Sequence, residues 1–150
     1  MGKADLVKVR KAVACLVNQE RKKRRLRAYR ENYRLRRAAL RHSRDMVRRS
    51  YFAHRSPGGS TADMRIRRSG YMRKARRWSV GEALAWGNGD EASPKRLVAA
   101  LMKSKSHRSL LLDRNFREVG IGVVLGAPVA RDGGPPALTL ALEFGITKRR

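Results

Sequence analysis

The chain has 150 residues, of which 41% are hydrophobic, so it can form one domain with a buried core and is not disordered by composition. It carries 37 lysine and arginine residues against 12 aspartate and glutamate residues, a formal net charge of +25 at pH 7. Such a charge attracts polyanions, either nucleic acid, anionic lipid or acidic cell-envelope polymers, although an arginine-rich solvated surface gives the same composition.

Residues 6–20 are predicted to form an amphipathic helix. One face repeats at intervals of three and four residues, at Leu6, Val9, Val13, Leu16, Val17 and Glu20. Cys15 lies in this segment and is the single cysteine, which excludes an internal disulfide and a cysteine-based metal site. Its apolar neighbours predict a buried thiol.

A basic run ends this apolar pattern and opens the most basic segment of the chain, residues 21–50. Within that segment, residues 32–49 are predicted to form a second helix, whose inner face carries Leu35, Ala38, Ala39, His42 and Met46. Because His42 shares the apolar face, we interpret it as a hydrogen-bonded core histidine and not as a metal ligand.

A turn is predicted at residues 56–60, with the sequence Ser-Pro-Gly-Gly-Ser. Ser60 or Thr61 can cap a short helix that runs to about residue 69. Gly70 suits the position just after that helix, where the backbone often turns left-handed.

The middle of the chain has weaker signals. Residues 72–79 are basic and are expected to be irregular, and residues 80–86 alternate enough to predict a short strand. Ser93 and Pro94 predict the start of another helix, with Ser93 as its cap and a buried face at Leu97, Val98, Leu101 and Met102.

Two strands are predicted near the end of the chain, at residues 119–125 and 138–144. The Gly- and Pro-rich loop 132–136 joins them, which predicts an antiparallel hairpin. Helices first, mixed short elements next and a hairpin last indicate an α+β fold with helices flanking a small antiparallel sheet. With no internal repeat and no linker, residues 1–150 are expected to form a single domain, with a motif-bearing core at about 13–145.

Four short segments stand in a fixed order, at Leu16–Arg21, Ala39–Met46, Phe52–Gly59 and Met64–Tyr71. In that order they resemble the LxNxxR, AxxHSxDM, FFSHxSPDG and DRxxxAGY motifs of the bacterial branch of the CAP superfamily, also called SCP-like domains. The resemblance covers nearly everything from about Val13 to Gly145. It implies an α-β-α sandwich with a central groove.

The resemblance also implies a polar cluster in the groove that can hold a divalent cation, most readily zinc. Carried onto this sequence, the cluster falls on His54, Glu82 and His107, with Ser104 and Arg108 as groove neighbours. Two neutral imidazoles and a carboxylate can bind zinc and leave one position open for water or another ligand.

Several positions depart from the family pattern. Ala83 replaces the asparagine of the GENI motif, Leu101 replaces a tryptophan, and Lys105 and Ser106 replace the Pro-Gly pair before His107. Many animal and plant members have a second glutamate where this chain has Ser104. Three of the four family ligands are therefore the most that this chain can supply.

Three classes of function stay open. The first is a non-enzymatic binding module, whose groove takes a divalent cation and whose neighbouring surface takes a lipid or a peptide. The second is a polyanion-binding protein, for nucleic acid, an acidic polymer or a membrane surface, that uses Arg21, Lys22, Lys23, Arg24 and Arg25. Sequence-specific DNA binding is not expected, because no nucleic-acid motif is found and aromatic residues make up only 6%.

The third class is a metal-dependent hydrolase that uses the same three groove residues. No separate general base is apparent, the HExxH zinc-protease motif is missing, and a Ser56–His54–Glu82 combination is of a kind that any chain this size offers. The sequence therefore leaves catalysis undecided and does not favour it.

Location and assembly follow from weaker arguments. The sequence contains no run of about 18 apolar residues, so no transmembrane helix is predicted. Met1–Arg10 lacks the features of a signal peptide. The resemblance implies an extracellular or cell-envelope protein, whereas the missing signal leaves a cytoplasmic location open. We expect a monomer.

Overall fold

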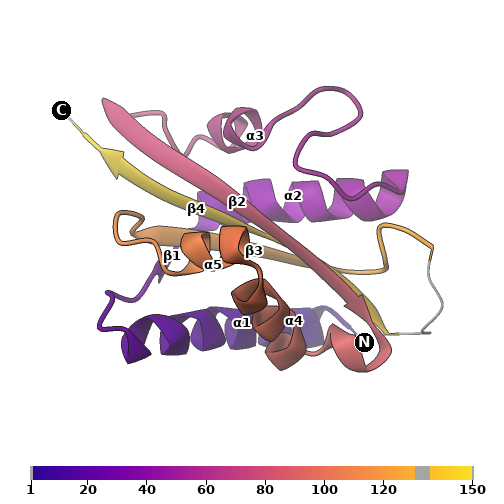
Figure 1. The fold of residues 1–150 in the computed structure, drawn as a ribbon. Coiled ribbons are helices and arrows are strands. Elements are labelled where there is room, and N and C mark those ends of the chain that lie inside the picture. The colour runs from indigo at the N-terminus through magenta and orange to yellow at the C-terminus, as the bar shows by residue number, and fades with distance from the viewer. Residues whose placement is uncertain (1, 131–135, 150) are drawn as a thin grey trace.

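The computed structural model describes residues 2–130 and 136–149. In chain order the elements are α1 (Lys3–Lys23), β1 (Arg30–Glu31), α2 (Tyr33–Arg49), α3 (Ala62–Arg68), β2 (Arg77–Asn88), the 3-10 helix η1 (Gly89–Ala92), α4 (Pro94–Lys103), α5 (Lys105–Leu111), β3 (Glu118–Leu125) and β4 (Ala137–Lys148). A layer of strands lies between α2 and α3 on one side and α1 and α4 on the other (Figure 1). This arrangement confirms the predicted α-β-α sandwich.

The sheet has the order β1-β3-β4-β2, with β4 pairing on both sides. Strand β4 runs antiparallel to β2 and to β3, which confirms the predicted hairpin between the last two strands. The short β1 pairs parallel with β3, so the sheet is mixed and not purely antiparallel as predicted. Of the loop predicted at 132–136, only Pro136 is among the described residues.

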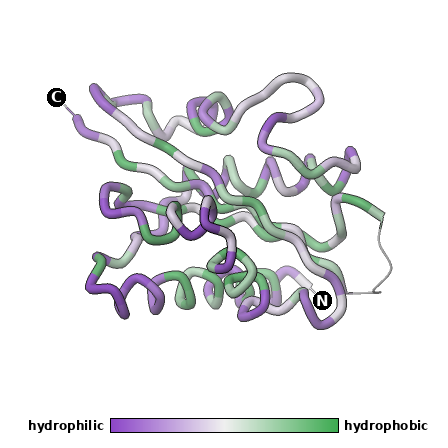
Figure 2. The backbone as a smooth tube through the Cα atoms, viewed as in Figure 1, coloured by the Kyte–Doolittle hydropathy of each residue, from purple (hydrophilic) through white to green (hydrophobic). Residues whose placement is uncertain are grey.

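Alternate residues of strand β4 face opposite layers of the sandwich. Leu138, Leu140, Leu142 and Phe144 belong to the main apolar core, together with residues of α1 and α4. Between them, Ala141 packs with residues of α2 on the other face. Apolar residues are concentrated along the strands, and hydrophilic residues dominate the outer turns of the helices (Figure 2).

Two glycines of β3 let helix α2 lie close against the sheet. A Cβ at Gly120 would come 2.0 Å from the backbone N of Arg36, and one at Gly122 would come 2.2 Å from that of Leu40. The Ser43 hydroxyl adds a hydrogen bond to the Gly122 carbonyl oxygen at 2.9 Å. These contacts fix α2 on the sheet and so position His42, the residue before Ser43.

The predicted helix starts are confirmed where a side chain caps the helix. The Asn32 side chain accepts hydrogen bonds from the first turn of α2, and the Ser93 hydroxyl accepts one from the Arg96 amide in α4. Helix α3 begins after Thr61 as predicted, although Thr61 makes no capping side-chain bond.

Other predictions require correction. Strand β2 is longer than the predicted 80–86, because pairing with β4 continues through the exposed residues Arg77, Trp78 and Ser79, which carry no apolar alternation. Cys15 is exposed, not buried, because α1 turns Val13, Ala14 and Val17 inward and leaves Cys15 on the outer face. Among the described residues, no helix is both long and apolar enough to span a bilayer.

Candidate functional site

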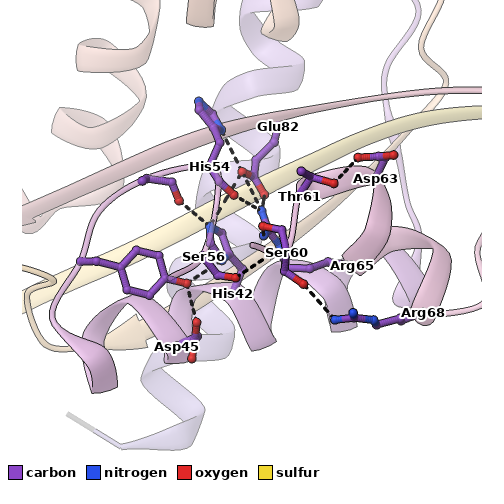
Figure 3. Close-up of polar contacts among 12 residues, drawn as sticks. His42, Asp45, His54, Ser56, Ser60, Thr61, Asp63, Arg65, Arg68 and Glu82 are labelled. Carbon is purple, nitrogen blue, oxygen red and sulfur yellow. Dashed lines mark hydrogen bonds and ion pairs between the residues drawn. The ribbon is translucent and has the colours of Figure 1, made fainter. Parts of the chain in front are cut away.

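His54 and Glu82 are in direct contact, as expected if they belong to one site. His54 lies on the loop between α2 and α3, Glu82 lies on β2, and His54 Nδ1 is 2.8 Å from Glu82 Oε1 (Figure 3). The Glu82 side chain is 2% exposed, whereas that of His54 is 60% exposed. Because an ionised carboxylate can only accept, Nδ1 carries the hydrogen, and Nε2 is a free acceptor when the ring is neutral.

Arg65 holds this pair in place from helix α3. Its Nη2 atom is 2.9 Å from Glu82 Oε2 and donates to the His54 carbonyl oxygen at 2.7 Å, while Nη1 donates to the Ser60 carbonyl oxygen at 2.8 Å. One guanidinium therefore connects α3, the loop and β2. Burial would raise the pKa of Glu82, but the neighbouring Glu143 carboxyl, His54 and Arg65 together lower it to about 2.

A second glutamate lies beside Glu82 and was not predicted as a site residue. Glu143 is opposite Glu82 in the β2–β4 ladder and is fully buried. Burial, and then the adjacent Glu82 carboxylate, raise the pKa of Glu143 well above its usual range, so its carboxyl is neutral near pH 7. The neutral Glu143 carboxyl carries an O–H group that can donate to the adjacent Glu82 carboxylate.

His42 is a buried core histidine, as predicted, but it also adjoins this cluster. Its Nε2 atom is 2.9 Å from the Ala53 carbonyl oxygen, to which it donates, and 3.8 Å from Glu82 Oε1. The Tyr51 hydroxyl lies 3.4 Å from His42 Nδ1 and donates a short hydrogen bond to Asp45. Burial lowers the pKa of His42, so the ring is neutral.

His107 lies at the start of α5, near His54. Burial, and then the charge of His54, lower the pKa of His107. The two predicted groove neighbours make local contacts: the Ser104 hydroxyl is 3.2 Å from that of Ser106, and Arg108 donates to the Met102 carbonyl oxygen at 3.3 Å. Both contacts order the junction between α4 and α5, which carries His107.

The predicted ligand set is thus only partly brought into contact. Both oxygens of Glu82 accept hydrogen bonds, from His54 and from Arg65. Across residues 2–130 and 136–149, no group of three or more His, Cys, Asp or Glu side chains is arranged to hold a metal ion. The ligand role of His54, Glu82 and His107 stays a prediction, and a Glu82 occupied in this way fits best as a support for His54.

The Ser56–His54–Glu82 combination does not form a catalytic arrangement. The Ser56 hydroxyl accepts a hydrogen bond from the Ser60 amide at 3.0 Å, and within the described residues no hydrogen bond joins Ser56 to His54. A serine nucleophile would need its base within hydrogen-bonding reach.

Arg21 must be removed from the predicted polyanion-binding run. It is 1% exposed, and its guanidinium donates to the carbonyl oxygens of Arg27, Leu111 and Asp113 at 2.7–2.9 Å. The same group stacks 3.6 Å over the Tyr29 ring. Arg21 therefore joins the end of α1 to the loop after α5, while residues 22–25 are exposed.

The sequence matches the profile of a known protein family. The profile of the family described as "CAP: Cysteine-rich secretory protein family" matches residues 15–130. The chain belongs to the CAP family. This CAP domain is 36% identical over 115 residues to the Bacillus subtilis protein YkwD, a match that covers 76% of this chain and 42% of YkwD. The CAP domain therefore spans less than half the length of that relative.

Solved structures share the fold of this CAP domain. An outer surface protein from Borrelia burgdorferi superposes with a TM-score of 0.77 at 20% identity, covering 94% of each chain. An extracellular protein containing a SCP domain from Bacillus anthracis gives 0.75 at 21% identity, covering 99% of this chain and 44% of that one. The first of these proteins is named as an outer surface protein and the second as an extracellular protein.

Proposed function

We propose that this CAP domain is a non-enzymatic binding module in which His54 and His107 hold a divalent cation, zinc being the best match to two imidazoles. The observation that carries the proposal is the 2.8 Å contact between His54 Nδ1 and Glu82. A metal-binding histidine commonly donates its other ring nitrogen to a carboxylate, which fixes the tautomer and the orientation of the ring. Glu82 then acts as that outer partner.

The chemistry of the surrounding groups fits this assignment. His107 has a lowered pKa, which favours the neutral form that a metal needs. The pKa of His54 is raised by its hydrogen bond to Glu82, so a cation must displace a proton from the exposed Nε2 atom. A bound cation would offer its remaining positions to water or to an oxygen ligand. Lys105, exposed next to the site, would weaken cation binding by repulsion.

The ionisation states of Glu82 and Glu143 favour a binding role over hydrolysis. With a pKa of about 2, Glu82 is a poor general base near neutral pH, and Glu143 is buried and neutral. A metal-dependent hydrolase would need a base closer to neutrality. Turnover of a peptide or ester that is lost with a chelator and with His54→Ala would replace the present proposal with that one.

An apolar cleft supports lipid as the organic ligand. A cavity of about 540 Å³ lies between α1, α2 and β3, with Leu6, Leu40 and Ile121 among its lining residues. Basic side chains, including Arg10 and Arg36, line the same cleft. An acyl chain could lie on the apolar side chains while its acidic headgroup meets the arginines. Given the surface and extracellular relatives, we propose that this happens outside the cell or in its envelope.

Zinc titration by calorimetry at about 150 mM salt tests the cation site while screening nonspecific charge effects. The exposed Cys15 thiol is itself a zinc ligand, so the titration uses a Cys15→Ser background. We expect saturable one-to-one binding that His54→Ala/His107→Ala abolishes and Glu82→Gln weakens. Equal binding by the parent and the double-histidine variant would contradict the proposal.

Polyanion binding is a second candidate, supported by the exposed Lys22, Lys23, Arg24 and Arg25 at the end of α1. Two of these, Lys23 and Arg24, also pair with Glu20. Affinity for DNA or for anionic vesicles should then fall steeply with salt, because counterions are released on binding. Replacing Lys22 and Arg25 by glutamine should make that slope shallower. An unchanged slope would remove this run from any polyanion site.

A further inference from the structure

A second pocket lies between α2, the loop at 50–61 and α3. It adjoins the buried cluster formed by Glu82, Glu143, His42 and Arg65. Its volume is about 300 Å³, enough for about ten water molecules at roughly 30 Å³ each. The lining includes four arginines, Arg41, Arg49, Arg65 and Arg68, and Asp45 as an acidic residue. Arg41, Asp45 and Arg49 come from α2, whereas Arg65 and Arg68 come from α3. The pocket is therefore strongly cationic.

The positive charge is not balanced within the protein. Arg49 is paired with Asp45 at 3.3 Å, and Arg65 is paired with Glu82 at 2.9 Å. By contrast, no carboxylate of the described residues lies within ion-pair distance of Arg41 or Arg68. The pocket thus has two arginines, one on each flanking helix, whose charge is free for a ligand.

Hydrogen-bond donors also outnumber acceptors in this pocket. The Ser60 hydroxyl oxygen accepts from Arg68 Nη1 at 2.9 Å, and the Ser56 hydroxyl oxygen accepts from the Ser60 amide at 3.0 Å. In the described part of the chain, neither hydroxyl has an acceptor for its own hydrogen. The buried Nε of Arg65 likewise has no partner there. A ligand with several acceptor oxygens would satisfy such a set.

We propose that this pocket binds a phosphate group, carried either by a soluble phosphate ester or by a phospholipid headgroup. A phosphate offers several charged oxygens that arginines from two helices and two serine hydroxyls can contact together, whereas a carboxylate offers only two oxygens. Charge-assisted hydrogen bonds of this kind give both affinity and orientation. The site is separate from the proposed cation site, because neither His54 nor His107 lines it.

Calorimetric titration with inorganic phosphate and with glycerol 3-phosphate tests the proposal at about 150 mM NaCl. The test variant is Arg41→Gln/Arg68→Gln, which removes two exposed charges and leaves the buried cluster intact. Its matched control is Lys95→Gln/Arg114→Gln, which removes two exposed charges outside the pocket. A neutral test is Ser60→Ala, which takes away a hydroxyl without changing net charge.

We expect saturable one-to-one binding, a Kd raised at least about tenfold by the pocket double variant, and a change under about twofold in the control. Ser60→Ala should raise the Kd by about threefold or more. Equal weakening by both double variants would show attraction by net charge alone and would overturn the site. Absence of saturable binding of either phosphate probe and of phosphatidic acid vesicles would overturn it as well.

Vesicle binding identifies which source of phosphate the pocket takes. Vesicles of phosphatidylcholine with phosphatidic acid are compared with soluble glycerol 3-phosphate at equal phosphate concentration. Binding to vesicles at least about tenfold tighter, and weakened by Arg41→Gln/Arg68→Gln but not by the control, supports a lipid headgroup. Equal or tighter binding of the soluble ester supports a soluble phosphate ester.

Discussion

Helices α1 and α4 cover one face of β4 with apolar side chains, whereas α2 and α3 cover the other face around a cluster of charged and polar groups. On the first face, Leu140, Leu142 and Phe144 are fully buried in a core of aliphatic and aromatic residues. On the second, Glu82, Glu143 and His42 are buried almost as completely. The first face therefore holds the largest apolar core, whereas the second combines smaller apolar clusters with buried polar groups that order a site.

The apolar face should be the more sensitive to truncation. Phe144 is fully buried, with its ring 5.5 Å from that of Tyr29 and 6.1 Å from that of Phe116. Phe144→Ala should lower the free energy of unfolding by about 3–5 kcal/mol, through lost burial and the cavity left behind. Denaturant unfolding measures this, with the exposed Leu125→Ala as control. A loss below about 1 kcal/mol would contradict the assignment of this face as the main core.

On the polar face, the largest effect should come from removing one partner of a buried pair. Arg65→Ala leaves the ionised Glu82 buried without its cation and should cost about 3 kcal/mol. Arg67→Ala, on the same helix but exposed, is the control and should cost well under about 1 kcal/mol. Equal losses in the two variants would mean that the Arg65–Glu82 pair does not hold the site together.

The two glutamates should give stability profiles of opposite sign against pH. The pKa of Glu143 is raised in the fold, so its contribution is fully present below its unfolded pKa, near 4.5, and is lost as pH rises. Glu143→Gln should therefore gain stability over the parent as pH increases from 4.5 to 7. The gain in free energy of unfolding, measured across this range, should shrink at low pH. A gain independent of pH would contradict a neutral buried Glu143.

For Glu82 the sign is reversed. Its pKa falls from 4.5 to about 2, so its stabilising contribution is present above pH 4.5 and is lost as pH falls toward 2. Glu82→Gln should be less stable than the parent at pH 7, and the difference should close between pH 4.5 and 2. Denaturant unfolding at several pH values measures the difference. If it stays constant over that interval, Glu82 is not the ionised partner described.

The smallest expected effects are in the titration of His54 and His107. The hydrogen bond to Glu82 raises the pKa of His54 above 6.5, while burial and the charge of His54 lower that of His107 below 6.5. NMR titration of the ring protons should give this order. Glu82→Gln should lower the pKa of His54. The reverse order of the two histidines would mean that His54 is not paired with Glu82.

Local patterns were sufficient to predict the parts of the fold that local chemistry determines. The capped start of α4 follows from Ser93, and the hairpin follows from two apolar strands around a Gly- and Pro-rich loop. Family motifs placed His54 and Glu82 in one predicted cluster, and the two side chains are in contact although they are far apart in sequence. These features are encoded within short stretches or within recognisable motifs.

Other features depend on contacts that no short stretch contains. Strand β2 extends through Arg77 because β4 pairs with it. Arg21 is buried because the carbonyl oxygens of Arg27, in the next loop, and of Leu111 and Asp113, about 90 residues away, surround it. Glu143 could have been recognised from the sequence as a candidate site residue, because it lies between Leu142 and Phe144 in an otherwise apolar strand. Alternation along the strand places it on the face opposite to Leu142 and Phe144. Only the pairing of β2 with β4 and the packing of α2 on the sheet bring Glu143 and His42 next to Glu82.

The central claim is that Glu82 orients His54 so that its Nε2 atom, together with His107, can bind a cation. NMR spectra that correlate imidazole nitrogens with ring protons, recorded on the Cys15→Ser protein during zinc titration, test it directly. We expect stoichiometric shifts of His54 Nε2 and of one His107 nitrogen, a retained hydrogen on His54 Nδ1, and unchanged signals of His42. Zinc bound at His54 Nδ1, or no shift of His54 and His107 at saturation, would contradict it.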